Sequence, residues 1–230
     1  IDIETDTSDM SILRPSATFC KDLSDMRNEY IQTDAYKKWI DNTWEIISEL
    51  AHSFNIEEKS GENINKVCDF VSTVYCDDKR LPHLANNETI INACLNSIGF
   101  YMYDFYQSNS SVPGSYTMRK MISLADRHVN EKGKLKFSLL SAHDSSISTI
   151  LIYLLGKNMR SYNRIPPYAS HLAMELWSSD DAPEDFYIRF ALNGKDLPLE
   201  KMENQTFVKY TEFKETYSDY TKYCTEVPSY

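Results

Sequence analysis

The segment Leu135–Leu155, which reads LKFSLLSAHDSSISTILIYLL, changes its periodicity in a way that decides the fold. Residues 135–142 are mostly apolar, which is typical of a strand buried in a parallel sheet. The polar cluster 143–146 follows, and its side chains favour helix starts. From Ile147 apolar residues recur at helical spacing until Gly156, a residue favoured just beyond a helix end. This pattern predicts a strand, a polar turn and a helix, as in an α/β fold.

Upstream of this unit the apolar spacing is helical. Steps of three and four residues predict helices over 34–54, 64–75, 90–105 and about 115–129. Thr33 or Asp34 is a suitable N-cap for the first of them. The polar stretch 108–114, which contains Pro113-Gly114, predicts a break before the last. Residues 1–20 alternate irregularly, and we expect them to be extended.

Downstream of the unit, apolar residues alternate with a period of two. This predicts strands around 172–176 and 186–192, and Asn193-Gly194 after the second is a strong hairpin-turn signal. Residues 207–213 predict a short last helix. The chain therefore reads as a helical block over about 21–112, a βα unit and an antiparallel pair.

Composition excludes several classes of protein. The chain has 230 residues and a formal net charge of −10, which argues against nucleic acid as a partner because phosphate backbones select basic surfaces. Hydrophobic residues make up 42%, enough for a core, but no uncharged apolar run reaches the length of a membrane-spanning helix. Ile1 is not a start methionine and no signal segment follows it, so we expect a processed product or a fragment.

Cysteines and glycosylation sequons indicate the compartment. None of the five cysteines forms a C-x-x-C pair, and their odd number leaves one thiol free or bonded to another chain. The N-x-[ST] pattern occurs at Asn87, Asn109 and Asn204, which we expect to be glycosylation sites. Together these features favour a secreted protein or one in the lysosomal or vacuolar lumen. The alternative is a cytosolic protein with free, buried thiols.

His143-Asp144 is the candidate site of chemistry. At the end of a parallel strand and the start of a helix, free N–H groups favour an anion, and a cationic imidazole adds two donors. The neighbouring carboxyl group of Asp144 can donate a proton, because a bound anion and partial desolvation favour its acid form. Phosphate ester cleavage needs these parts. The alternative is that both residues only cap the helix.

Other catalytic patterns are missing from the sequence. There is no G-x-S-x-G elbow and no glycine-rich phosphate loop. The remaining histidines, at 52, 83, 128 and 171, do not have metal-ligand spacing. We therefore expect neither a metal nor an organic cofactor.

The segment from Phe137 to Trp177 combines several motifs: Ala142, His143-Asp144, Ser145-Ser146, Pro166-Pro167-Tyr168-Ala169-Ser170 and Glu175-Leu176. With these motifs it resembles the second half of the histidine acid phosphatases, the family of prostatic and lysosomal acid phosphatases. The resemblance implies an α/β sandwich like that of phosphoglycerate mutase, with an inserted all-α subdomain and its N-terminal strands missing. In that fold 1–20 is an extended segment of the core, 21–112 the helical subdomain and 113–230 the C-terminal part of the core.

The resemblance also assigns roles to residues. His143 would bind the phosphoryl group and Asp144 would be the general acid that protonates the leaving oxygen. The family's nucleophilic histidine lies in an Arg-His-Gly-x-Arg-x-Pro motif, which is missing here. Arg127-His128 is followed by Val129 and lacks that context. The partners implied are a phosphate monoester and an N-terminal portion of the same protein carrying the nucleophile, with a homodimer left open.

Further residues follow or depart from the family pattern. Cys20 and Cys224 resemble a disulfide pair of the family. The usual partner of Cys76 is missing, so Cys76 bonds Cys68 or Cys94, or stays free. Glu175 matches the family, but a carboxylate in a strand can also anchor backbone or an arginine.

The resemblance therefore implies an acid phosphatase that works through a phosphohistidine, with this chain supplying His143 and Asp144. The chain alone would be inactive because it lacks the nucleophile. Two alternatives remain, an inactive phosphatase-like module used for binding and a structural glycoprotein subunit. A membrane tether outside this segment is left open.

Overall fold

A computed structural model describes residues 20–77, 87–108, 111–131, 136–161 and 166–225, and the expected extended segment 1–19 lies outside them. The chain divides into two compact units. One is Arg27–Phe105, and the other combines Ile1–Met26 with Tyr106–Tyr230.

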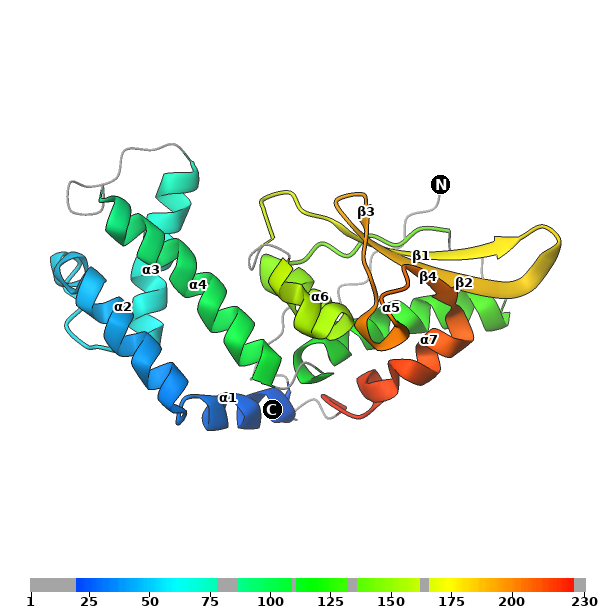
Figure 1. The fold of residues 1–230 in the computed structure, drawn as a ribbon, viewed down its shortest axis with the longest axis horizontal. Coiled ribbons are helices and arrows are strands. Elements are labelled where there is room, and N and C mark those ends of the chain that lie inside the picture. Colours follow the sequence, from blue (N-terminus) through cyan, green and yellow to red (C-terminus); the bar gives the residue numbers. More distant parts are fainter. Residues whose placement is uncertain (1–19, 78–86, 109–110, 132–135, 162–165, 226–230) are drawn as a thin grey trace. The chain divides into compact units, whose positions relative to one another are not determined.

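The unit Arg27–Phe105 is built from helices (Figure 1). It takes in the end of α1 (Lys21–Tyr30), then α2 (Asp34–Ser53), α3 (Gly61–Cys76) and most of α4 (Glu88–Ser108). The last three match the helices predicted from spacing, and α1 is an additional helix. Thr33 caps α2, since its Oγ1 accepts a hydrogen bond from the N–H of Tyr36 at 3.2 Å.

The apolar faces of these helices form one core. Its fully buried members include Ile47 of α2, Ile64 of α3 and Cys94 of α4. A disulfide joins Cys68 to Cys94 within this core. Cys76 is exposed and free, so the alternatives that bond Cys76 to either of them are wrong.

The other unit carries the sheet. Strands β1 (Leu172–Ser179) and β2 (Ala182–Leu192) pair antiparallel, and β2 also pairs with β3 (Lys195–Asp196) and β4 (Phe207–Lys209). The turn Asn193-Gly194 joins β2 to β3 with positive φ at both residues, which confirms the hairpin signal. Helices α5 (Ser111–Glu131) and α7 (Tyr210–Thr216) lie along one face of the sheet (Figure 1).

Two predicted helix boundaries are wrong. Helix α5 begins at Ser111 and includes Pro113 and Gly114, which we expected to lie in a break. Proline is tolerated in the first turn of a helix because its missing N–H would have no intrahelical partner there. Phe207 belongs to β4, where it pairs with Arg189 of β2, so the last helix starts only at Tyr210.

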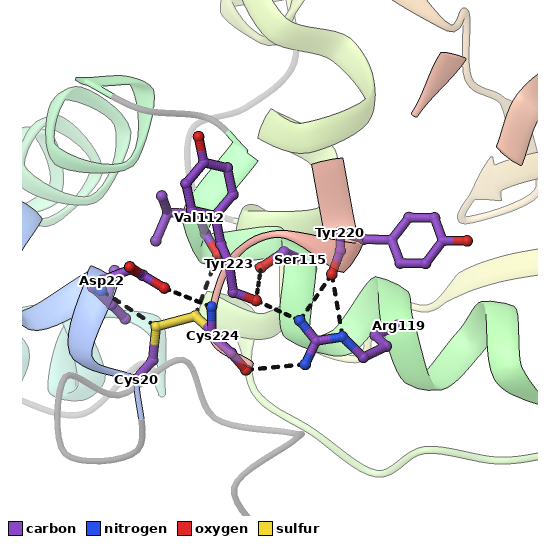
Figure 2. The surroundings of a disulfide bond; sticks show 9 residues. Cys20, Asp22, Val112, Ser115, Arg119, Tyr220, Tyr223 and Cys224 are labelled. Atoms are coloured by element: carbon purple, nitrogen blue, oxygen red, sulfur yellow. Dashed lines mark hydrogen bonds between the residues drawn. A yellow bond between two sulfur atoms is a disulfide. The ribbon is translucent and has the colours of Figure 1, made fainter. Parts of the chain in front are cut away.

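The two ends of the described chain are joined in what we call the C-terminal closure (Figure 2), formed by Cys20, Asp22, Arg119 and Tyr220–Cys224. The disulfide Cys20–Cys224 implied by the family resemblance is present. The main-chain N–H of Cys224 donates a hydrogen bond to Oδ2 of Asp22 at 2.7 Å. A covalent bond and a charge-assisted hydrogen bond thus join the first and last described segments of this unit to each other.

Arg119 of α5 holds the last turn of the closure (Figure 2). Its guanidinium donates to the carbonyl oxygens of Tyr220 (2.8 and 3.2 Å), Cys224 (2.9 Å) and Tyr223. Residues Ser218–Thr221 form a 3-10 helix, whose terminal carbonyls lack partners within the helix. Arg119 supplies a partner for the carbonyl oxygen of Tyr220 in this helix and for those of Tyr223 and Cys224 just beyond it, and it places a favourable positive charge at this helix end. Arg119 could not be identified from the sequence, because its partners are backbone groups about a hundred residues away and leave no local pattern.

Candidate functional site

His143 and Asp144 lie where helix α6 (Asp144–Leu155) begins, as the sequence predicts. His143 is the extended N-cap residue, and its carbonyl oxygen accepts from the N–H of Ser146 at 3.1 Å. Its own N–H donates to Oγ of Ser146 at 3.3 Å. Oδ1 of Asp144 accepts from the N–H of Ser145 at 2.6 Å. The imidazole and the carboxylate are therefore presented at the positive end of a helix, which favours an anion.

The rest of α6 is buried and fixed, which gives the site a rigid base. Burial raises the pKa of the Tyr153 hydroxyl, which stays neutral and donates to the carbonyl oxygen of Tyr217. The same hydroxyl oxygen accepts from the N–H of Tyr220 at 3.0 Å. Gly114 of α5 faces Tyr153 so closely that a Cβ there would lie 2.7 Å from the Tyr153 Cβ. Helix α6 is thus held by α5 and by the segment that leads to the C-terminal closure.

In contrast to its helix, the doublet itself faces solvent. His143 and Asp144 are both exposed, and so are most of the residues just before them. Phe137 and Leu139 have 77% and 79% of their surface exposed. Exposure of these two large apolar side chains to water costs a free energy of about 25 cal/mol per Å² of apolar surface. Among the described residues, the segment before His143 is therefore an apolar surface that nothing covers.

The predicted strand 135–142 is the main error of the sequence analysis. Its described part, 136–142, is not a strand, and among the described residues no strand pairs with it. All pairings in the described sheet are antiparallel, so the expected parallel edge beside His143 is not formed. The apolar pattern was that of a strand, but a strand exists only when a neighbour supplies ladder hydrogen bonds.

Glu175 anchors an arginine, which was one of the two readings left open. Its Oε2 accepts from Nη2 of Arg189 at 2.7 Å and from Nε1 of Trp177 at 3.0 Å. Asp196 lies 3.4 Å from the same guanidinium. All of these groups lie on the β1–β2–β3 sheet, so Glu175 orders the sheet surface.

One group of metal-ligating atoms comes together in the described part of the chain, at Cys20, Asp22 and Cys224. Its two sulfurs are bonded to each other, so neither can act as a thiolate ligand. Arg127-His128, rejected as a nucleophile motif from the sequence, lies within α5, where the His128 ring contacts Phe186 edge-on. Neither group adds chemistry to the His143-Asp144 site.

A mixed α/β unit with an imidazole–carboxyl doublet at a helix start is an arrangement that favours an oxyanion ligand. Comparison with known families makes this specific. The sequence profile of the histidine phosphatase superfamily (branch 2) matches residues 9–193, and the chain belongs to this superfamily. The mixed α/β architecture is consistent with the fold of that superfamily.

Two relatives show how much of a longer protein this chain matches. It is 23% identical over 205 residues to Counting factor 60 of Dictyostelium discoideum, covering 89% of this chain and 47% of the relative. It is 32% identical over 84 residues to 2-phosphoxylose phosphatase 1 of Xenopus tropicalis, covering 36% of this chain and 15% of the relative. The chain thus spans about half the length of the first relative and less of the second. Among its described residues, no helix has both the length and the apolar character needed to cross a membrane.

Proposed function

We propose that this chain is the His-Asp part of an acid phosphatase that hydrolyses phosphate monoesters through a phosphohistidine. The observation that carries the proposal is the exposed His143-Asp144 doublet at the N-terminus of a buried helix, in a member of the histidine phosphatase superfamily. The nucleophilic histidine belongs to an N-terminal portion of the same protein. The exposed apolar segment around Phe137 and Leu139 supports this, since it is a surface on which that portion would pack.

In the first step the nucleophilic imidazole nitrogen attacks phosphorus, and the bond from phosphorus to the ester oxygen breaks. His143 donates an N–H to a non-bridging oxygen of the phosphoryl group, where negative charge must be held. Asp144 in its acid form gives its proton to the leaving oxygen, which departs as an alcohol.

In the second step water attacks the phosphohistidine. The Asp144 carboxylate takes a proton from that water, the bond from nitrogen to phosphorus breaks, and inorganic phosphate leaves. The free histidine and the acid form of Asp144 are restored. An acid in the first step and a base in the second are the two roles that one carboxyl group can play.

The test uses native material rather than the isolated chain. Intact mass and N-terminal sequencing show whether a companion polypeptide with an Arg-His-Gly sequence is present. We expect the native protein to hydrolyse a generic aryl phosphate at low pH, and acid-labile phosphate to be trapped on a histidine of the companion. Active material with no histidine-bound phosphate would contradict the mechanism.

A second candidate is a phosphatase-like module without catalysis that serves as a binding or structural glycoprotein subunit. It is supported by one of the relatives, whose name, Counting factor 60, states no enzymatic activity. The two candidates differ in the companion. Replacement of its Arg-His-Gly sequence, with no hydrolysis of any phosphate in a panel that includes a phosphorylated sugar, would favour the second.

We further propose a secreted or lysosomal location. The disulfides Cys20–Cys224 and Cys68–Cys94 support an oxidising compartment, since cytosolic thiols are kept reduced.

A further inference from the structure

Two of the three sequons lie in the described residues, one in each unit. Asn87-Glu88-Thr89 stands at the start of α4, and Asn204-Gln205-Thr206 follows the 3-10 helix Glu200–Met202. Both asparagines are exposed. The third, Asn109, lies outside the described residues. The folded chain therefore presents two candidate asparagines to solvent, and their side-chain contacts decide whether a modification fits.

Among the described residues, the side-chain amide of Asn87 forms a hydrogen bond through its oxygen and none through its nitrogen. Oδ1 accepts a hydrogen bond from the N–H of Thr89 at 2.8 Å, which caps the first turn of α4. The main-chain oxygen of Asn87 accepts from Ile91 at 2.9 Å. In the described part of the chain Nδ2 makes no hydrogen bond. Attachment of a group to Nδ2 would keep Oδ1 as an acceptor, so the cap of α4 would survive.

The side-chain amide of Asn204 is engaged in the same way, but the backbone conformation of this residue differs. Its φ of 62° places it in the left-handed region, which asparagine tolerates better than most residues. Its N–H donates to the carbonyl oxygen of Leu199 at 3.0 Å, so the turn is fixed by its backbone. Oδ1 accepts from Nδ2 of Asn158 at 2.7 Å. Again, within the described ranges, Nδ2 of Asn204 donates to no acceptor.

We propose that Asn87 and Asn204 carry N-linked oligosaccharides in the mature protein. The donor is an oligosaccharide joined through diphosphate to a lipid. The asparagine Nδ2 forms a bond to C1 of the first sugar, the bond from C1 to the diphosphate oxygen breaks, and the lipid diphosphate leaves. One amide proton is lost to a base, and no oxidation or reduction occurs. Glycosylation requires that the asparagine of a sequon is accessible, and both Asn87 and Asn204 are exposed.

The first test maps the native protein. Peptide N-glycosidase in ¹⁸O-labelled water converts each glycosylated asparagine to labelled aspartate, and a digest without the enzyme is the control. We expect label at both residue 87 and residue 204. An unlabelled peptide at either position overturns the assignment there, and native protein whose mass the enzyme does not change overturns the proposal.

The second test uses variants matched to the structure, expressed by the source cells. Asn87→Asp and Asn204→Asp keep an acceptor oxygen for Thr89 and Asn158 but cannot be glycosylated, so folding and modification are separated. Each should lower the mass of the secreted protein by one oligosaccharide. Thr89→Ser and Thr206→Ser keep the sequon and should keep the oligosaccharide. An unchanged mass in either aspartate variant overturns the site concerned.

Discussion

The C-terminal closure and the start of helix α6 belong to the same unit but differ in how their polar and apolar groups are matched. In the closure, Arg119 supplies donors to the carbonyl oxygens of Tyr220, Tyr223 and Cys224, and Asp22 accepts from a main-chain N–H. At α6, by contrast, His143 and Asp144 are exposed, and two large apolar residues stand in water just before them.

The difference between the paired groups of the closure and the exposed groups at the start of α6 distinguishes residues that stabilise the fold from residues proposed to take part in a reaction. Groups that serve stability find their partners within the chain, because a buried carbonyl oxygen without a partner costs about 1–3 kcal/mol. Groups that serve a reaction must meet molecules from outside and are left accessible. The predictions below test this separation, from the largest expected effect to the smallest.

The largest effect is expected at the exposed doublet. In the catalytically complete protein, Asp144→Asn should lower turnover by about 100- to 10,000-fold, the usual range for loss of a general acid. Inhibition by phosphate or tungstate should remain, because in the proposed mechanism His143 binds the anion and is unchanged. Turnover with an aryl phosphate is measured, with Asp181→Asn, an exposed change in the β1–β2 turn, as the control. If the Asp144→Asn variant is as active as the parent, another group protonates the leaving oxygen.

The next effect is expected at the disulfide of the closure. Replacing Cys20 and Cys224 together by Ser opens a covalent loop with a sequence separation of 204 residues. On the chain-entropy account this lowers the free energy of unfolding by about 5 kcal/mol. Urea unfolding measures the loss. A control, Cys76→Ser, changes a thiol that is free and exposed and should cost less than about 0.5 kcal/mol.

Arg119 should matter to stability and not to chemistry. Arg119→Met removes the donors to three carbonyl oxygens, and we expect a loss of about 3 kcal/mol in the free energy of unfolding. Arg119→Lys keeps the charge but loses the planar geometry and should recover only part. Urea midpoints give the ranking of the three proteins. Equal stability of the parent and Arg119→Met would show that Arg119 does not stabilise the closure.

The smallest effect concerns pH. Hydrogen bonds from Lys201 and Lys222 lower the pKa of Asp219 to about 2, from an ordinary value near 3.8. Because the folded value is the lower one, this carboxylate stabilises the fold above about pH 4, and the contribution is lost as pH falls towards 2. Asp219→Asn should cost about 1 kcal/mol at pH 6 and almost nothing at pH 2. A difference between the parent and Asp219→Asn that stays constant over this range would contradict the assignment.

Local patterns in the sequence were sufficient where the interactions are local. Helical spacing predicted α2, α3 and α4. Thr33 was one of two cap candidates, and it could be predicted because its acceptor oxygen lies three residues from the donor N–H. The turn Asn193-Gly194 was predicted because few residues adopt positive φ at low cost. The position of His143-Asp144 at a helix start followed from the same local logic. The anion-binding and proton-donating chemistry was inferred from the residue types, and the family resemblance gave each residue its specific catalytic role.

Only the tertiary structure decided features that depend on distant partners. The segment 136–142 has the composition of a strand but, without a neighbouring strand in the described chain, it forms none. Phe207 belongs to β4 because β2 supplies the partner strand for its backbone hydrogen bonds. Cys68 bonds Cys94 and not Cys76, because helix packing brings Cys68 and Cys94 together. Arg119 gained its role from carbonyl groups about a hundred residues away. Residue spacing along the chain predicts turns and helix faces. Contacts between residues that are distant in the sequence depend on which surfaces the fold brings together.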